Sequence, residues 1–289
     1  MADVADYSRG MHWIGHAGSL VPVKDRGSVS VTDDVEPSIQ VSLGGVRRAR
    51  VSRNRPPRSW SLSMPDAHAD DVAHVRSLMT ATLPPYQLVT AEAQVSNVLT
   101  PERSVMSDSN PALSLGGWWP IAGEYQGGGA LARLNPSAAF GSIATVYIGP
   151  APVPPVWTGR AVTASVLVAT ARAAGAGFWF RWLNAAGSPL SGAPAATSTT
   201  ATGMDGLRRV TATATPAPGA AACRLEVRYA EVIAQPQVTW TDGPVEWAPG
   251  NGADRVVITG LDRDTELQVP DSRNLRRASY SLNLTEVGP

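Results

Sequence analysis

The stretches "SWSLSM" at 59–64 and "SYSLNL" at 279–284 decide the fold expected for this chain. Both run Ser, aromatic, Ser, Leu, then Ser or Asn, then an apolar residue. Alternation at period two indicates a strand that buries one face. That face holds Trp60, Leu62, Met64, Tyr280, Leu282 and Leu284. We expect the two strands to be neighbours in one sheet, although they lie near opposite ends of the chain.

Other alternating runs flank these two stretches. They lie at 28–32, 39–43, 86–90 and 254–261, and "SYSLNL" itself belongs to a longer run at 277–287. One helix is predicted at 70–81, because Asp66, Asp70 and Asp71 at or before its first turn suit the helix dipole. Its apolar stripe consists of Val72, Val75, Leu78 and Met79, and we expect that stripe to pack on the sheet.

Composition changes abruptly inside the chain. Residues 97–247 hold 17 Asp, Glu and Arg in 151 positions, whereas the other 138 positions hold 31 charged residues. Neither flank alone has enough strands for a stable sheet with covered edges. We therefore expect a discontinuous outer β-domain of residues 1–95 and 248–289, with residues 96–247 inserted as a second domain.

The inserted segment is also predicted to be all-β. Its short runs are separated by turn signals, as in a sandwich of antiparallel strands. The runs are "SIATVYIG" (142–149), "RAVTASVLVAT" (160–170), "GFWFRWL" (177–183), "LRRVTATATP" (207–216) and "CRLEVRY" (223–229). The expected fold class is all-β throughout, with one helix in the outer domain.

Charge and cysteine content limit the possible functions. With 24 Lys and Arg against 24 Asp and Glu the formal net charge is zero, so no global attraction to nucleic acid or anionic membrane is expected. The single cysteine, Cys223, allows neither an internal disulfide nor a cysteine metal site, and we interpret it as a small buried residue. No secretory signal or membrane span is expected, so we expect a soluble chain made in a cytoplasm.

Four pieces of the middle segment carry a resemblance to jelly-roll domains of the carbohydrate-binding, galactose-binding-like type. They are "NPALSLGGWWP", "GRAVTASVLVAT" with Ser165 at the Ser position, "FRWLNAAGSPL" and "RRVTATATPAPGAAACRLEV". The whole chain resembles minor tail and distal tail proteins of siphophages that infect actinobacteria. "NVLTPE" before the jelly roll, "EWAPGNG" after it and the closing "YSLNLTEVG" carry this second resemblance.

The resemblance implies a split, tail-tube-like β-sandwich or barrel domain that forms a ring, usually a hexamer, at the tail tip. The implied role is a structural virion protein that links the tail tube to the baseplate, with no enzymatic activity and no cofactor. Implied partners are other copies of the chain, the tail tube protein, tail-tip hub or tape-measure proteins, and a host cell-wall glycan. Assembly would take place in the host cytoplasm, without membrane or sequence-specific nucleic-acid contacts.

Searching for reactive groups leaves few candidates. His12 and His16 are four residues apart, but the two glycines of "HWIGHAGSL" fit no helix, so turn or interface residues are favoured over a metal pair. His68 and His74 flank the predicted helix start, where a ligand cluster with Asp70 or Asp71 is the alternative to solvated side chains. The sequence has no nucleophile elbow, zinc-protease or phosphate-loop motif, and the chain is not expected to be an enzyme.

A basic run, "RRARVSRNRPPR" at 47–58, holds six arginines and no acid. The candidate interface residues are Arg47, Arg48, Arg50, Arg53, Arg55 and Arg58. Arginine can bind carboxylate or phosphate with two parallel hydrogen bonds. The run could contact an acidic face of a neighbouring subunit or DNA, or it could be a solvated hairpin.

Tryptophans are the candidate glycan-binding residues, because sugars stack their apolar faces on aromatic rings. Seven of the nine lie in the inserted segment. In "FWFRW", alternation separates Trp179 and Arg181 from the two phenylalanines. The ligand-binding candidates are Trp118, Trp119, Trp179 and Arg181. The alternative is that these rings fill the core.

Two other functions stay open from the sequence. A carbohydrate-binding module of a cell-surface protein would explain the middle segment but not the flanks. A baseplate component of a phage-like injection system would share the fold and differ only in genomic setting.

Overall fold

The computed structural model describes most of the 289-residue chain. The described residues are 11–24, 29–33, 38–41, 47–50, 57–105, 118–125, 129–134, 154–169, 177–190, 199–201, 208–228, 232–264 and 277–287. The chain is mostly β, and it divides into two compact units. The first comprises Met1–His12, Val21–Tyr86 and Arg255–Pro289, and the second comprises Trp13–Leu20 and Gln87–Asp254.

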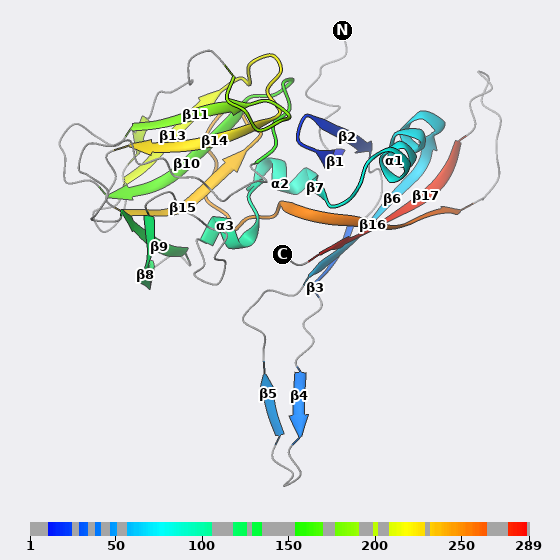
Figure 1. Cartoon of the computed structure of the whole chain (residues 1–289), viewed down its shortest axis with the longest axis horizontal. Coiled ribbons are helices and arrows are strands. Elements are labelled where there is room, and N and C mark those ends of the chain that lie inside the picture. The colour runs from blue at the N-terminus through cyan, green and yellow to red at the C-terminus, as the bar shows by residue number, and fades with distance from the viewer. Residues whose placement is uncertain are drawn as a thin grey trace. The chain divides into compact units, whose positions relative to one another are not determined.

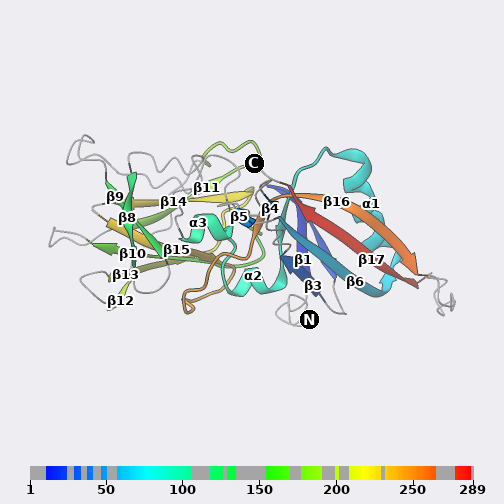
Figure 2. The same ribbon diagram turned by 90° about the horizontal axis from the view of Figure 1, so that it is seen from below.

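In the first unit, the two stretches that resemble one another pair directly. Strand β17 (Arg277–Glu286) runs antiparallel to β6 (Arg58–His68), with Leu282 opposite Leu62 and Leu284 opposite Trp60. The expected pairing is thus confirmed, and the red and blue-cyan strands lie side by side in both views (Figures 1 and 2). The apolar face of both strands is buried, at 2% exposure or less for Trp60, Leu62, Met64, Leu282 and Leu284.

This pair is flanked by one strand on either side, in the order β16-β17-β6-β3. Strand β16 (Ala253–Asp264) pairs with β17, and β3 (Val29–Asp33) pairs with β6. Helix α1 (Ala69–Ala81) follows β6, as predicted. The first unit is therefore built from segments near both ends of the chain.

The apolar stripe of α1 differs from the expected one at one position. Val72, Val75 and Leu78 are buried, but Met79 is 44% exposed. At 100° per residue, position 79 falls within the angular range of 72, 75 and 78, so helical spacing alone does not explain its exposure. Tyr86 binds the last turn of this helix, because its hydroxyl donates a hydrogen bond to the Leu78 carbonyl oxygen at 3.0 Å.

In the second unit the strands form two β-layers (Figures 1 and 2), and apolar side chains such as Val162, Val166 and Val210 are buried. One is a six-stranded sheet in the order β12-β13-β10-β15-β9-β8, and the other is the pair β11-β14. The strands are β8 (Trp118–Tyr125), β9 (Gly129–Leu134), β10 (Val162–Ala169), β11 (Gly177–Leu183), β12 (Thr199–Ala201), β13 (Arg208–Ala214), β14 (Ala222–Arg228) and β15 (Val232–Thr239). The predicted run at 142–149 lies outside the described residues, and the jelly-roll topology stays a prediction.

A piece near the N-terminus also belongs to the second unit. Strand β1 (Met11–His16) pairs with β7 (Tyr86–Val89), and Trp13 lies opposite Val89. The turn into β2 (Ser19–Lys24) passes Gly18, whose φ is +86°. A Cβ there would come within 2.8 Å of Ala185 and 3.0 Å of Ala221, so only glycine fits this close approach.

This placement changes the interpretation of "HWIGH". His12 is a buried strand residue at 2% exposure, and His16 ends the same strand. The expectation of a turn at this position was wrong, because the two glycines sit within and after a strand. Among the described residues, no group of three His, Cys, Asp or Glu side chains is placed to hold a metal ion.

Candidate functional site

The first four residues of the basic run form β5 (Arg47–Arg50), which pairs with β4 (Ser38–Val41). The register places Arg50 opposite Ser38, Arg48 opposite Gln40 and Arg47 opposite Val41. This ladder is a sheet of its own among the described strands (Figure 1). Arg53 and Arg55 lie outside the described residues.

Arg58 behaves differently from a surface contact residue. It is 4% exposed, and its Nε lies 3.2 Å from Oε2 of Glu286. Its Nη2 donates to Oε1 of the same carboxylate at 3.3 Å, and its backbone N–H donates to Oε2 at 3.2 Å. The guanidinium also lies over the Trp60 ring, 4.8 Å from the centroid. Arg58 therefore joins the start of β6 to the end of β17, which leaves it little surface for a neighbouring subunit.

Replacing Glu286 by glutamine is expected to lower the free energy of unfolding by about 2 kcal/mol, because a charged hydrogen-bonded pair loses one charge in a buried position. Urea denaturation of the full chain measures the change. As a control, Asp262→Asn alters an exposed carboxylate that accepts a hydrogen bond from Asn283, and it should shift stability by less than about 0.5 kcal/mol. Equal effects of the two substitutions would contradict this account of Arg58.

The candidate glycan residues do not come together in one sheet. Trp118 and Trp119 begin β8, an edge strand of the six-stranded sheet. Trp179 and Arg181 lie on β11 in the other layer, where Trp179 is opposite Glu226. The side chains of the three tryptophans lie outside what the structure describes. The four residues therefore lie on strands of two different sheets, and not on adjacent strands as a single sugar site on one sheet would require.

Arg181 has a neighbour that the sequence did not single out. Arg224 lies directly opposite it on β14, and both are half-buried. Like charges directly opposite one another in a ladder destabilise it. An acidic group near this pair would offset the repulsion, although each arginine also makes further contacts within the fold.

A tryptophan cluster in the second unit was also missed. The Trp13 ring lies 4.8 Å from that of Trp157 and 6.0 Å from that of Trp240, measured between centroids. Trp13 and Trp240 are buried, Trp157 is half-buried, and Trp240 Nε1 donates to the Pro155 carbonyl at 3.2 Å. Sequence separation hides such a cluster, since Trp13 comes from the far N-terminal piece. These rings pack together within the unit, whereas the core alternative for Trp118, Trp119 and Trp179 stays a prediction.

The two segments that lead into and out of the strands of the second unit are bound to each other. We call Ser96–Ser104 the first connection and Glu246–Asp254 the second connection. Asn97, fully buried, donates from Nδ2 to the carbonyls of Ala248 (3.0 Å) and Pro236 (3.3 Å). Its Oδ1 accepts from the backbone N–H groups of Val238 (3.1 Å) and Leu99 (3.2 Å). One side chain thus satisfies four backbone groups on three segments, and three of these hydrogen bonds are buried.

Glycine allows the two connections to touch along their backbones. A Cβ at Gly252 would overlap the carbonyl oxygen of Val98, and one at Gly250 would overlap those of Leu99 and Thr100. Gly252 N–H donates to the Leu99 carbonyl at 3.0 Å. The motifs "NVLTPE" and "EWAPGNG", which carried part of the resemblance, are therefore the two halves of one contact.

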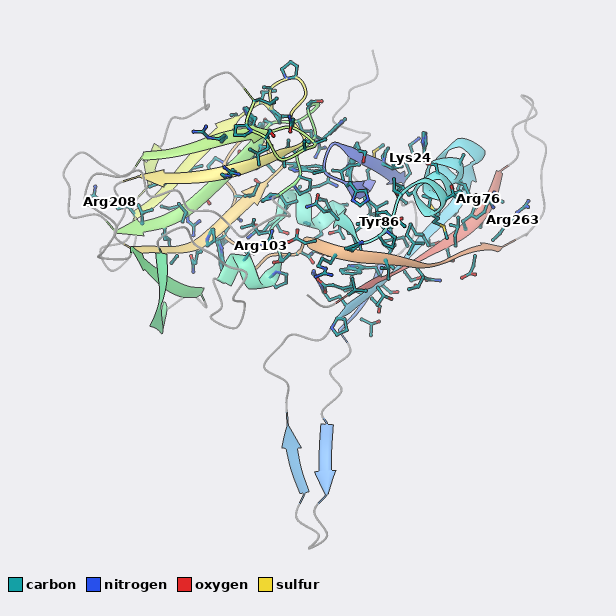
Figure 3. The ribbon with its side chains drawn as sticks, in the orientation of Figure 1. Lys24, Arg76, Tyr86, Arg103, Arg208 and Arg263 are labelled. Atoms are coloured by element: carbon teal, nitrogen blue, oxygen red, sulfur yellow. The ribbon has the colours of Figure 1, made fainter. Side chains whose placement is uncertain are left out.

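Helix α3 (Pro101–Val105) strengthens the contact with side chains. Its Arg103, labelled in Figure 3, forms a 2.7 Å ion pair with Asp254, and both side chains are at most 14% exposed. The Ser104 hydroxyl accepts from Gly250 N–H at 2.6 Å and donates to the Pro101 carbonyl at 2.8 Å. Little room is left for the two connections to slide past each other.

Gln237 carries the contact into the six-stranded sheet. Its Nε2 donates to the carbonyls of Ser96 (2.8 Å) and Glu246 (2.9 Å), one from each connection. Its Oε1 accepts from the Ser165 hydroxyl at 3.1 Å. The sheet face that carries Ser165 is therefore covered here by the chain's own connections.

Arg209 continues this polar network across three strands. It donates to Ser165 Oγ and to Gln235 Oε1, both at 2.9 Å. Gln235 has a φ of +50°, which is uncommon for a residue other than glycine, and it lies where the β10–β15 register shifts. The hydrogen bonds that Arg209 donates to Gln235 stabilise the positive φ of Gln235.

Two further side chains with shifted pKa values, Cys223 and Arg160, give no sign of a reactive site. Complete burial raises the pKa of the Cys223 thiol to about 12, so it is protonated at neutral pH, as expected of a small core residue. Partial burial lowers the pKa of Arg160, whose Nη1 donates to Gln94 Oε1 at 3.4 Å. Within the described ranges, no helix is long and apolar enough to cross a membrane.

Comparison with known proteins gives no family assignment. No family model and no curated protein matches this sequence.

Proposed function

We propose that this chain is a structural component of a phage tail tip, of the distal-tail or minor-tail class. It would form a homo-oligomeric ring, with six subunits as the resemblance implies, between the tail tube and the baseplate. Its partners would be other copies of itself, the tail tube protein and the tail-tip hub or tape-measure proteins. It would act in the virion after assembly in the host cytoplasm.

The pairing of β6 with β17 is the observation that supports this proposal most. It joins segments near both chain ends in one sheet, so that along the sequence the larger segment of the second unit, Gln87–Asp254, falls between β6 and β17. An assembly domain can accept such an insertion because its own strands still pair with each other. The contact between the two connections holds the base of the inserted segment in one conformation.

Negative-stain electron microscopy and multi-angle light scattering of the full recombinant chain test the proposal. We expect rings with a central hole and a mass that is a multiple of 30.3 kDa. A protein that stays monomeric at micromolar concentration would count against the tail-ring role.

Glycan binding by the second unit is a second candidate, favoured by the opposed pair of Arg181 and Arg224. Arginine binds carboxylates with two hydrogen bonds, so acidic cell-wall saccharides are the class to test. We expect such a saccharide to quench tryptophan fluorescence of the full chain and Arg181→Ser to abolish the quenching. An unchanged signal across an acidic glycan panel would exclude this site.

A further inference from the structure

A tight turn of the second unit carries a tryptophan and an arginine. Residues 157–160 read Trp, Thr, Gly, Arg, and the Arg160 N–H donates to the Trp157 carbonyl oxygen at 3.1 Å. Thr158 and Gly159 in the middle of the turn are exposed, and Trp157 and Arg160 are half-buried. The first and last Cα atoms of such a turn lie within about 7 Å of each other. An aromatic and a cationic side chain therefore start close together, just before β10.

The segment that leads into this turn is fixed within the unit. Pro155 forms a β-bridge with Ala222, and its carbonyl oxygen accepts a hydrogen bond from Trp240 Nε1 at 3.2 Å. The Trp157 ring lies 4.8 Å from the Trp13 ring, measured between centroids. A ligand that contacts Trp157 therefore meets a ring that is already held in place, so little conformational entropy is lost on binding.

Gly159 lies against the Trp157 ring. A Cβ at Gly159 would come within 2.7 Å of Cζ2 and 2.9 Å of Cε2 of that ring. Any other residue at this position would therefore collide with the ring or displace it from Trp13. Ligands with apolar C–H surface stack on aromatic rings, and the half-buried Trp157 keeps part of its surface exposed for such a contact.

The charge of Arg160 has no carboxylate beside it in the described part of the chain. Arg58 and Arg103, in contrast, each form an ion pair with a carboxylate, at 3.2 Å and 2.7 Å. Arg160 Nη1 donates instead to a neutral amide, Oε1 of Gln94, at 3.4 Å, and Gln94 is 1% exposed. A guanidinium has five N–H donors, so Arg160 keeps donors for an anionic ligand.

Partial burial adds to the attraction of Arg160 for an anion. It lowers the pKa of the guanidinium, because the charged form is less well solvated there than in water. An arginine nevertheless stays protonated at neutral pH. A carboxylate that binds it with two parallel hydrogen bonds would replace the lost solvation.

The two side chains together favour a carboxylated saccharide over an acidic peptide. In a uronic acid the carboxylate is attached directly to a sugar ring, whose C–H face can stack on an aromatic ring. Both features thus fit within the span of about 7 Å between the ends of the turn. An acidic peptide side chain carries its carboxylate on a flexible stem and offers no comparable flat C–H face.

We propose that Trp157 and Arg160 form a binding site for a carboxylated saccharide, with the sugar ring on Trp157 and the carboxylate on Arg160. The exposed Thr158 between them supplies a hydroxyl that can bind a sugar hydroxyl. This site uses neither residue of the opposed pair, Arg181 and Arg224, which lies on β11 and β14. It goes beyond the tail-ring role and does not depend on ring formation.

Isothermal titration calorimetry of the full chain tests the site with two probes. They are tetragalacturonate and a tetrasaccharide of alternating glucuronate and N-acetylglucosamine. The control ligands are the same saccharides with their carboxylates reduced to alcohols. We expect the wild type to bind a charged probe and to bind its reduced form about 10-fold or more weakly, because charge-assisted hydrogen bonds are lost.

Two variants address the two contacts. Arg160→Gln removes the charge and should weaken binding of the charged probe about 10-fold or more. Gly159→Ala places a methyl group against the Trp157 ring and should also weaken binding. The control is Arg208→Gln, because Arg208 is an exposed arginine of the same unit (Figure 3), and this variant should bind as the wild type does. Unchanged near-ultraviolet circular dichroism shows that the variants fold.

The outcomes separate this inference from the proposed function. Wild-type affinity in Arg160→Gln, or no binding of either charged probe at millimolar concentration, overturns the site whether or not the chain forms rings. Binding that is lost in Arg181→Ser but kept in Arg160→Gln assigns the saccharide to the opposed pair and overturns it too. A polyglutamate peptide that binds as tightly as the charged saccharides would make an acidic peptide the ligand, against this inference. A monomeric chain that shows the expected loss in Arg160→Gln supports the site and counts against the tail ring alone.

Discussion

Asn97→Ala is expected to lower the free energy of unfolding of the second unit by about 4 kcal/mol or more. The substitution removes four hydrogen bonds at once, and each abandoned buried backbone group costs about 1–3 kcal/mol. Water cannot readily replace the side chain, because Asn97 is 0% exposed. A loss of this size is exceptional for one polar residue.

Hydrogen exchange followed by mass spectrometry locates the effect, since both connections should lose protection together. Asn184→Ala is the matched control, because that amide oxygen also accepts two backbone N–H groups, from Ala186 and Ser188, but in an exposed turn. We expect the control to cost about 1 kcal/mol, since water can satisfy the freed groups. Similar losses in both variants would mean that Asn97 does not hold the two connections together.

Gly252→Ala is the second substitution with a large expected effect, a destabilisation of about 3 kcal/mol or more through overpacking. The added Cβ would overlap the carbonyl oxygen of Val98 and lie 2.8 Å from its carbonyl carbon. Val98 cannot move aside freely, because its N–H donates to the Val238 carbonyl at 2.7 Å. The two connections must therefore separate to accept one methyl group.

A control for this prediction lies in the preceding turn. Gly243 has no atom within 4 Å of an added Cβ, so Gly243→Ala should change stability by less than about 1 kcal/mol. Urea denaturation of both variants measures the difference. A Gly252→Ala protein as stable as the Gly243→Ala protein would contradict the backbone contact between the connections.

Much of the first unit could be predicted because each of its main strands has a period-two alternation of side chains that is visible in its own short stretch of sequence. Period-two alternation located β6 and β17, and their similar order of residues predicted their pairing, which the register of Leu62 with Leu282 confirms. The stripe of Val72, Val75 and Leu78 similarly located α1. Met79 was misassigned because helical spacing places it on the buried stripe, whereas its exposure depends on which surfaces pack against the helix and not on spacing.

The candidate site was less predictable. Six arginines stood out as one run, yet Arg58 neutralises Glu286 from the other end of the chain while Arg47, Arg48 and Arg50 lie on a separate ladder. Their different roles depend on register and on a distant carboxylate. The boundaries expected near 95 and 248 stay a prediction, and the second unit also holds Trp13–Leu20.

The sequence by itself determined the all-β character, the position of α1 and the pairing of the two Leu-centred strands. These follow from side-chain periodicity, which is a local property. Only the tertiary structure decided that Asn97 binds both connections, that Trp13 packs against Trp157 and Trp240, and that Gly252 must lack a side chain. Each of these depends on backbone segments far apart in the chain, whose close approach leaves no pattern in either segment alone.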